Sequence, residues 1–195
     1  MAETELPNPE ELEEIKEKRF HSKVAMITAV YAVILAFSSL GGNHAMKEML
    51  LSQQQASDQW AYYQAKSIRE HLYQSQKAML ENQLSLMSGT LGADRLAKAS
   101  AAIKAFGDQQ ARFAREKEQI MHKARELEKE RDKSRSKDPY FEYAEVLLQI
   151  AIIMASVSIL ADSLAVFSFS AVFALFGAFL CANGYLQFLV IPFLH

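Results

Sequence analysis

Residues 24–42, VAMITAVYAVILAFSSLGG, and residues 140–161, YFEYAEVLLQIAIIMASVSILA, are the two long apolar stretches that decide the fold. A third apolar stretch, residues 164–194, follows almost at once. A helix needs roughly 20 apolar residues to cross the hydrocarbon core of a bilayer. We therefore expect an all-α membrane protein whose transmembrane helices cover 24–42, 139–161 and 164–184, followed by an apolar tail at 185–195.

The charged side chains gather in two other segments. Residues 1–23 hold 4 basic and 7 acidic side chains, and residues 43–139 hold 17 basic and 13 acidic ones, so their net charges are −3 and +4. Asn8 and Pro9 form a typical helix start, which predicts a charged N-terminal helix at 1–23 that runs into the first span. The preceding charges favour a retained anchor over a secretory signal.

Segment 43–138 has the periodicity of two long helices. Residues at alternating spacings of three and four are typical of a coiled coil. In the second half this row is Leu96, Ala99, Ile103, Phe106, Gln110, Phe113, Lys117, Ile120, Ala124 and Leu127. In the first half a weaker row is Ala61, Ala65, Ile68, Leu72, Ser75, Met79, Asn82 and Leu86.

A turn at residues 89–93 is expected to join these two helices. Gly89 can end the first helix, and Asp94 can cap the second. The result is a long antiparallel coiled-coil hairpin between the first and second spans, with arms roughly 70 Å long. Counting outward from the turn pairs Ile68 with Phe113 and Trp60 with Met121.

The most distinctive stretch of this hairpin is residues 53–73, QQQASDQWAYYQAKSIREHLY, which holds aromatic and basic residues. Trp60 lies roughly 27 Å beyond Gly42 if the helix continues straight, too far for a ring at the membrane interface. We expect these rings to pack within the hairpin or between subunits; an arm lying flat on the bilayer and a ligand site are the alternatives. The candidate interaction residues are Trp60, Tyr62, Tyr63, Lys66, Phe106 and Phe113.

One stretch also carries a family resemblance. QASDQWAYYQAKSIREHLY (residues 55–73), preceded by SSLGGNHAMKEMLL (38–51), closely resembles bacterial membrane proteins catalogued as domain of unknown function 4337. The resemblance extends to LLQIAIIMASVSILA (147–161) and nearly the whole chain. It implies a three-span bacterial membrane protein and brings no activity with it.

The second span carries polar side chains on one face, namely Glu142, Glu145, Gln149 and Ser156. Polar groups within a span suggest an ion path or a contact with another subunit. Alternatively, the two glutamates are simple interfacial charges near the basic residues that precede the span.

Catalytic and metal-binding patterns are missing from the sequence. The five histidines are scattered, and the single cysteine, Cys181, lies within an apolar stretch. No catalytic or metal-ligand spacing is present, and acids alternate with the basic residues of the return helix. We expect no enzyme activity, no catalytic residue, no metal, no cofactor and no nucleic-acid partner.

The charge signals for topology conflict. Lys16, Lys18, Arg19 and Lys23 favour a cytoplasmic N-terminus, whereas the basic residues at 129–137 favour a cytoplasmic hairpin. Long translocated segments are largely insensitive to charge. We therefore expect a cell inner membrane protein with its N-terminus cytoplasmic; the reverse orientation and a first stretch that does not span are the alternatives.

A lone two-helix hairpin buries little apolar surface, so a homo-oligomer is expected. Small residues would lie at the helix contacts in the bilayer: Ser38, Ser39, Gly41, Ala155, Ser156 and Gly177. The leading hypothesis is a non-enzymatic membrane scaffold or interaction protein that presents the hairpin to an unknown protein partner. The alternative is a small oligomeric channel or transporter-like protein that uses the polar face of the second span and Asn183. The expected partners are membrane lipid and further copies of the chain.

Overall fold

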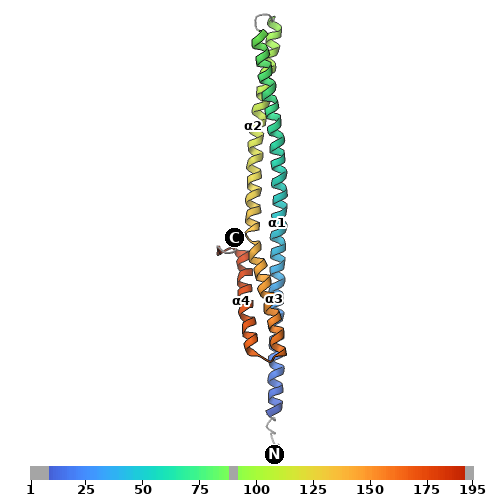
Figure 1. Cartoon of the computed structure of the whole chain (residues 1–195), viewed down its shortest axis with the longest axis vertical. Coiled ribbons are helices and arrows are strands. Elements are labelled where there is room, and N and C mark those ends of the chain that lie inside the picture. Colours follow the sequence, from blue (N-terminus) through green and yellow to red (C-terminus); the bar gives the residue numbers. More distant parts are fainter. Residues whose placement is uncertain (1–8, 88–91, 192–195) are drawn as a thin grey trace, which may run out of the picture. The chain divides into compact units, whose positions relative to one another are not determined.

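The computed structural model describes residues 9–87 and 92–191, with side chains from Glu13 onward. Within these ranges all regular structure is helical: α1 (Pro9–Met87), α2 (Ala93–Arg135), α3 (Asp138–Leu160) and α4 (Leu164–Leu186) (Figure 1). The expected all-α class is confirmed. The Asn8 cap, most of the turn at 89–93 and the tail residues 192–195 lie outside the described part of the chain.

Helix α1 is a single helix of 79 residues. It contains the charged residues 9–23, the first apolar stretch and the first half of segment 43–138, so the expected continuity of the N-terminal helix with the apolar stretch is confirmed. Its more buried positions recur at spacings of three and four from Val24 to Leu84. One side of α1 therefore faces neighbouring helices along most of its length.

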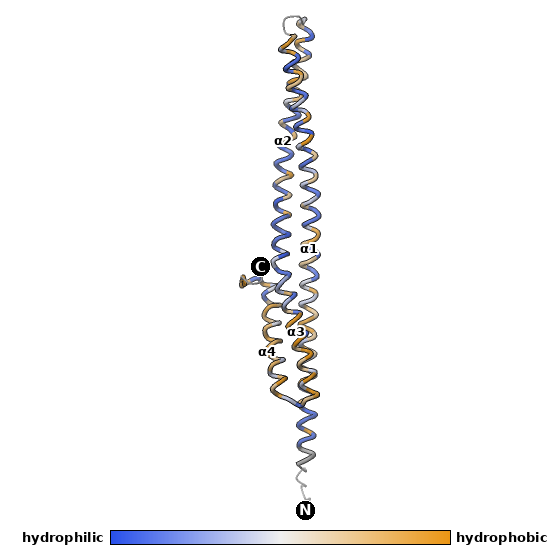
Figure 2. The backbone as a smooth tube through the Cα atoms, in the orientation of Figure 1, coloured by the Kyte–Doolittle hydropathy of each residue, from blue (hydrophilic) through white to orange (hydrophobic). Residues whose placement is uncertain are grey.

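The chain divides into two compact units, and α1 contributes to both. The apolar unit is Met1–Glu48 with Lys133–His195, and the charged unit is Met49–Asp132. Hydrophobic residues dominate α3 and α4, whereas α2 alternates between hydrophilic and hydrophobic residues (Figure 2). Each unit is described separately below.

In the apolar unit, α3 and α4 pack against each other and against α1. The core contains Tyr31 of α1, Leu148 and Ala151 of α3, and Ala174 of α4. A tight turn at Asp162 and Ser163 joins α3 to α4, as expected. Asp162 has a φ of 45°, a left-handed conformation that a short polar side chain tolerates.

Small residues allow these three helices to approach closely. A Cβ at Gly41 would lie 2.5 Å from Cε1 of Phe141, and one at Gly184 would lie 2.8 Å from the same atom. Gly177 leaves similar room for Leu148. Ser38, Gly41, Ala155 and Gly177 were expected at helix contacts, and the structure buries all four within the chain. Gly41 and Gly177 lie against large side chains of α3.

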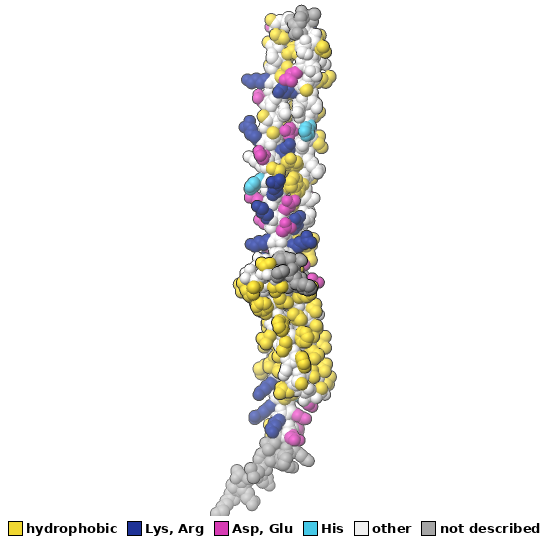
Figure 3. Space-filling model, turned by 60° about the vertical axis from the view of Figure 1, so that its left-hand side comes forward, with side chains coloured by type: hydrophobic (Ala, Val, Ile, Leu, Met, Phe, Trp, Pro, Cys, Tyr) yellow, Lys and Arg dark blue, Asp and Glu magenta, His cyan; other side chains and the backbone are white. Residues whose placement is uncertain are grey.

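The outer surface of the apolar unit is also hydrophobic (Figure 3). Its exposed side chains include Phe37, Ile153, Phe169 and Leu175, with exposed fractions between 57% and 71%. Monomeric soluble proteins rarely expose apolar patches of this extent. Three helical stretches, Glu13–Met87, Ala93–Leu160 and Leu164–Leu186, are long and apolar enough to cross a membrane.

Candidate interaction surfaces

The row predicted on the return helix faces α1 in the charged unit. Phe113, Ile120 and Ala124 are buried, and most of the row between Ala99 and Leu127 is at least partly buried. Leu96, at the start of the row, is 43% exposed. Hydrophobic periodicity therefore found the correct side of α2.

The row predicted on α1 faces solvent, so this prediction was wrong. We call Ala61, Ala65, Ile68, Leu72, Met79 and Leu86 the outer row. Ile68 is 69% exposed, Met79 is 63% exposed and Leu86 is 86% exposed. An inner row of α1 instead faces α2, and it consists of Ser52, Ala56, Gln59, Tyr63, Lys66, Glu70, Tyr73, Lys77, Leu80 and Leu84.

The inner row is mostly polar, and two of its charged residues, Lys66 and Glu70, have partners on α2. Lys66 donates to Glu116 at 2.5 Å, and Lys117 donates to Glu70 at 2.6 Å. A charge at a seam position is expensive unless an opposite charge satisfies it. Lys117 occupies such a position on α2 and is paired with Glu70 of the inner row.

These pairs shift the pKa values of their members. Hydrogen bonds from Lys66 and Arg112 lower the pKa of Glu116, and the bond to Glu116 raises the pKa of Lys66. The bond to Glu70 raises the pKa of Lys117. Each of these three shifts favours the charged form of its group.

Aromatic contacts define the register of α1 against α2. Tyr73 stacks on Phe113 with ring centroids 5.5 Å apart, and Trp60 Nε1 donates to Glu128 at 2.9 Å. The expected pairs, Ile68 with Phe113 and Trp60 with Met121, were therefore wrong. The two helices are offset from the expected pairing, and the aromatic and charged contacts fix the observed register.

Five of the six candidate interaction residues face the interior of the charged unit. Trp60 and Tyr63 contact edge to face at 5.5 Å, and Phe106 lies 6.0 Å from Tyr73 between ring centroids. Lys66 and Phe113 are each 9% exposed. Tyr62 is the exception at 50% exposed, although the Lys66 ammonium lies 5.2 Å from its ring centre.

The sequence interpretation missed Tyr73, Glu70, Glu116 and Glu128 as members of this network. One signal was available: Lys117 occupies a seam position of its row, and a buried lysine requires an acidic partner. Residues 43–87 contain several acids, however, so the sequence could not identify which one pairs with Lys117.

The polar face of α3 points outward from the apolar unit. Glu142, Gln149 and Ser156 are exposed, and Glu145 is half-buried. Glu142 and Glu145 line a cavity with Ser39, Gly42, Asn43 and Asp138. The Ser156 hydroxyl donates to the carbonyl of Ile152 at 2.9 Å, so its polar group is satisfied within its own helix.

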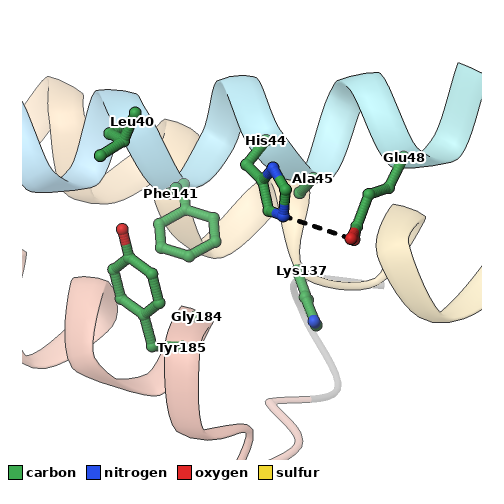
Figure 4. A pocket seen from close by; sticks show the side chains of 9 residues that line it. Leu40, His44, Ala45, Glu48, Lys137, Phe141, Gly184 and Tyr185 are labelled. Atoms are coloured by element: carbon green, nitrogen blue, oxygen red, sulfur yellow. Dashed lines mark ion pairs between the residues drawn. The ribbon is translucent and has the colours of Figure 1, made fainter.

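A second cavity, of about 310 Å³, lies where α1, α3 and α4 meet (Figure 4). Its lining is Leu40, Gly41, His44, Ala45, Glu48, Lys137, Phe141, Gly184 and Tyr185. Leu40, Phe141 and Tyr185 supply large apolar surfaces, and His44, Glu48 and Lys137 supply polar groups beside them. The sequence interpretation had not identified this site, because no motif marks it.

Asn183 closes the end of α4. Its side chain is buried; the amide nitrogen donates to the carbonyl of Leu189 at 2.8 Å, and its oxygen accepts from the Leu189 amide at 3.0 Å. We had grouped Asn183 with the polar face of the alternative channel hypothesis. Its hydrogen-bonding groups are instead engaged by the chain that follows α4.

These features define a class: an all-helical protein with three helices suited to crossing a membrane and a separate charged unit of two paired helices. The chain belongs to the family described as Domain of unknown function (DUF4337), which matches residues 20–187. The family resemblance seen in the sequence is thus confirmed. No curated protein and no solved structure matches the chain.

Proposed function

We propose that this protein is a non-enzymatic integral membrane scaffold that assembles into homo-oligomers and presents α1 and α2 as an antiparallel coiled coil. The outer row of α1 is the observation that carries this proposal. With the polar residues Ser75 and Asn82 between its last apolar members, it repeats every three and four residues, as a helix-pairing surface does. In the described part of the charged unit, α2 covers the opposite side of α1 and leaves this row exposed.

Burial of the outer row would supply substantial binding energy. Ile68, Leu72, Met79 and Leu86 are all more than half exposed. Burying a large apolar side chain contributes about 1.5–3 kcal/mol. Four such side chains contacting the same row of a second copy would contribute several kcal/mol per chain, even after the ordering cost of association.

The polar face of α3 supports the same assembly. Gln149 lies near the middle of a 23-residue helix and is exposed. A polar side chain facing lipid at that depth is unfavourable, whereas two facing amides hydrogen-bond to each other. A second copy is the simplest source of such a partner.

Mass photometry in mild detergent tests the oligomer. We expect the wild-type chain to be oligomeric and the double variant Ile68→Glu, Leu72→Glu to shift toward monomer. Gln74→Glu is the matched control, because Gln74 is exposed on the same helix and points away from the outer row. A monomeric wild type, or a double variant that assembles normally, would contradict the proposal.

The alternative function is a small oligomeric channel or transporter-like assembly. The outward orientation of Glu142, Glu145 and Gln149 favours it, because the same face in a ring of copies would line a polar path. Conductance in liposomes that is lost in Glu145→Ala and retained in Glu118→Ala would select the channel. Oligomeric protein in non-conducting vesicles would select the scaffold.

The proposed location is the bacterial inner membrane, with a cytoplasmic N-terminus. The basic residues ahead of the first apolar stretch support this orientation. A reporter inserted between residues 89 and 94 measures it directly. Reporter activity in the cytoplasm would reverse the proposed orientation without affecting the scaffold or the oligomer.

A further inference from the structure

The cavity shared by α1, α3 and α4 lies at the end of three apolar segments. The first apolar stretch ends at Gly42, α3 begins at Asp138 and α4 ends at Leu186. Leu40 and Tyr185, at the cavity wall, are 64% and 51% exposed. In a membrane-embedded chain the cavity therefore opens at the level where acyl chains meet headgroups.

The wall of this cavity is apolar and preformed. Phe141 is 2% exposed, and Gly41 and Gly184 contact its ring. Tyr185 packs edge to face against Phe141 at 4.9 Å, and its hydroxyl donates to the carbonyl of Phe37 at 2.8 Å. Both rings are thus fixed before any ligand enters.

The polar side of the cavity carries an available positive charge. Glu48 is the one carboxylate among the lining residues, and it already has two partners. His44 lies 3.2 Å from one of its oxygens, and Ser134 donates to the other at 3.2 Å. Among the described side chains, no acid lies within ion-pair distance of Lys137.

Two further basic residues precede Lys137. Lys133 and Arg135 lie in the last turn of α2, and both are exposed. Neither has an ion-pair partner among the described side chains. Lys98 on α2 is likewise unpaired, but it lies far along the chain from the cavity, whereas Lys133 and Arg135 precede the lining residue Lys137 by four and two residues. A cluster of basic residues next to a membrane segment attracts anionic lipid headgroups.

We propose that this cavity binds one anionic phospholipid. The phosphate pairs with Lys137, and Lys133 and Arg135 add attraction from the adjacent turn. The hydrocarbon lies against Leu40, Phe141 and Tyr185. This inference rests on the membrane insertion included in the proposed function, and it is independent of oligomerisation and of conductance.

The combination of charge and apolar wall selects a phospholipid over free phosphate. Free phosphate would pair with the lysine but would gain nothing from the apolar wall. A zwitterionic lipid would use the wall but would gain little from the positive cluster. Each cluster residue near the surface contributes about 1 kcal/mol to anionic lipid binding, which corresponds to about a fivefold change in affinity.

Native mass spectrometry of the full chain in mild detergent tests the site. We expect phosphatidylglycerol to remain bound where phosphatidylcholine and inorganic phosphate do not. Lys137→Gln should weaken phosphatidylglycerol binding about fivefold, and the triple variant with Lys133→Gln and Arg135→Gln should abolish the preference for it. Lys137→Arg should retain it.

Two further variants separate the cavity from a general basic patch. Leu40→Trp places a large ring at the cavity wall without a change of charge, so it should reduce phosphatidylglycerol binding. Lys23→Gln removes an exposed lysine at the other end of the same apolar stretch and should leave binding unchanged. Equal retention of all three ligands, or normal binding by Leu40→Trp and Lys137→Gln, would overturn the inference.

Liposome flotation of the same samples separates this inference from the proposed function. If the chain does not insert into liposomes, both are overturned. If the chain inserts but shows no preference for phosphatidylglycerol, only the lipid site is overturned.

Discussion

The two units use opposite ways of holding helices together. In the apolar unit, helices touch through small residues, as where Gly41 and Gly184 contact Phe141. In the charged unit, α1 and α2 are joined by long polar side chains such as Lys66 and Glu116. The difference matches the outer surface of each unit. Where that surface is apolar, close packing supplies the attraction. Where it is charged, ion pairs and aromatic contacts also join the two helices.

The largest expected effect comes from adding one methyl group to the apolar unit. The Cβ of Gly41→Ala would lie 2.5 Å from Cε1 and 2.7 Å from Cζ of Phe141, a buried ring with little room to move. We expect a loss of about 1–3 kcal/mol in unfolding free energy. Thermal unfolding in detergent, followed by circular dichroism, measures it. An unchanged Tm would show that Phe141 can be displaced easily.

A smaller effect is expected when one charge is removed from the charged unit. Lys66→Met leaves Glu116 with Arg112 as its partner, so Tm should fall by several degrees and hydrogen exchange should increase in the charged unit. Lys66→Arg should restore most of the loss. Lys98→Met removes an exposed lysine from α2 and serves as the control. Equal effects of Lys66→Met and Lys98→Met would argue against a role for the ion pair in stability.

The charged unit should also be the more sensitive to pH. Glu116 has a lowered pKa in the folded chain, so its stabilising contribution is present above its ordinary value of 4.5 and is lost as pH falls toward the folded pKa. Lys66 has a raised pKa, so its contribution is present below 10.5 and is lost as pH rises toward the folded pKa. Tm should therefore form a plateau between these limits. Glu116→Gln should flatten the acidic decline, and an unaltered decline would assign it to other carboxylates.

The smallest expected effect has the opposite sign. A Cβ at Gly107 in α2 would meet nothing closer than the Lys77 ammonium at 3.8 Å. Because glycine within a helix costs about 0.5–1 kcal/mol relative to alanine, Gly107→Ala should stabilise the charged unit by about that amount. A glycine-to-alanine substitution should thus destabilise the apolar unit at Gly41 and stabilise the charged unit at Gly107. If hydrogen exchange in α2 fails to slow, close contacts not seen at Gly107 must oppose the change.

The sequence predicted the helices well, because long apolar stretches and heptad spacing are local signals. It also identified the side of α2 that contains Phe113 and Ile120. It failed on α1, where the more apolar row is the exposed one. The inner row of α1 becomes favourable only beside acidic and aromatic side chains of α2. One of these is Glu116, which is 50 residues from Lys66 along the chain. Spacing along one helix contains no information about charges on the other.

The candidate sites show the same limit. The polar face of α3 could be described from spacing alone, because its members lie on one helix. The cavity around Phe141 could not, because its lining comes from three helices that are far apart in sequence. Small residues such as Gly41 were recognisable as contact positions. Whether they contact the same chain or another copy depends on where Phe141 lies.

The chain that follows α4 is positioned by more than Asn183. The Ile191 amide donates to the Tyr140 hydroxyl at 3.0 Å, and that hydroxyl lies 3.3 Å from the carbonyl of Leu189. The polypeptide therefore leaves α4 beside the first turn of α3, away from the Asp162 turn. A fluorescent or enzymatic tag attached downstream of Ile191 would emerge in the compartment that contains the start of α3. It would report the sidedness of that helix without interrupting any helix.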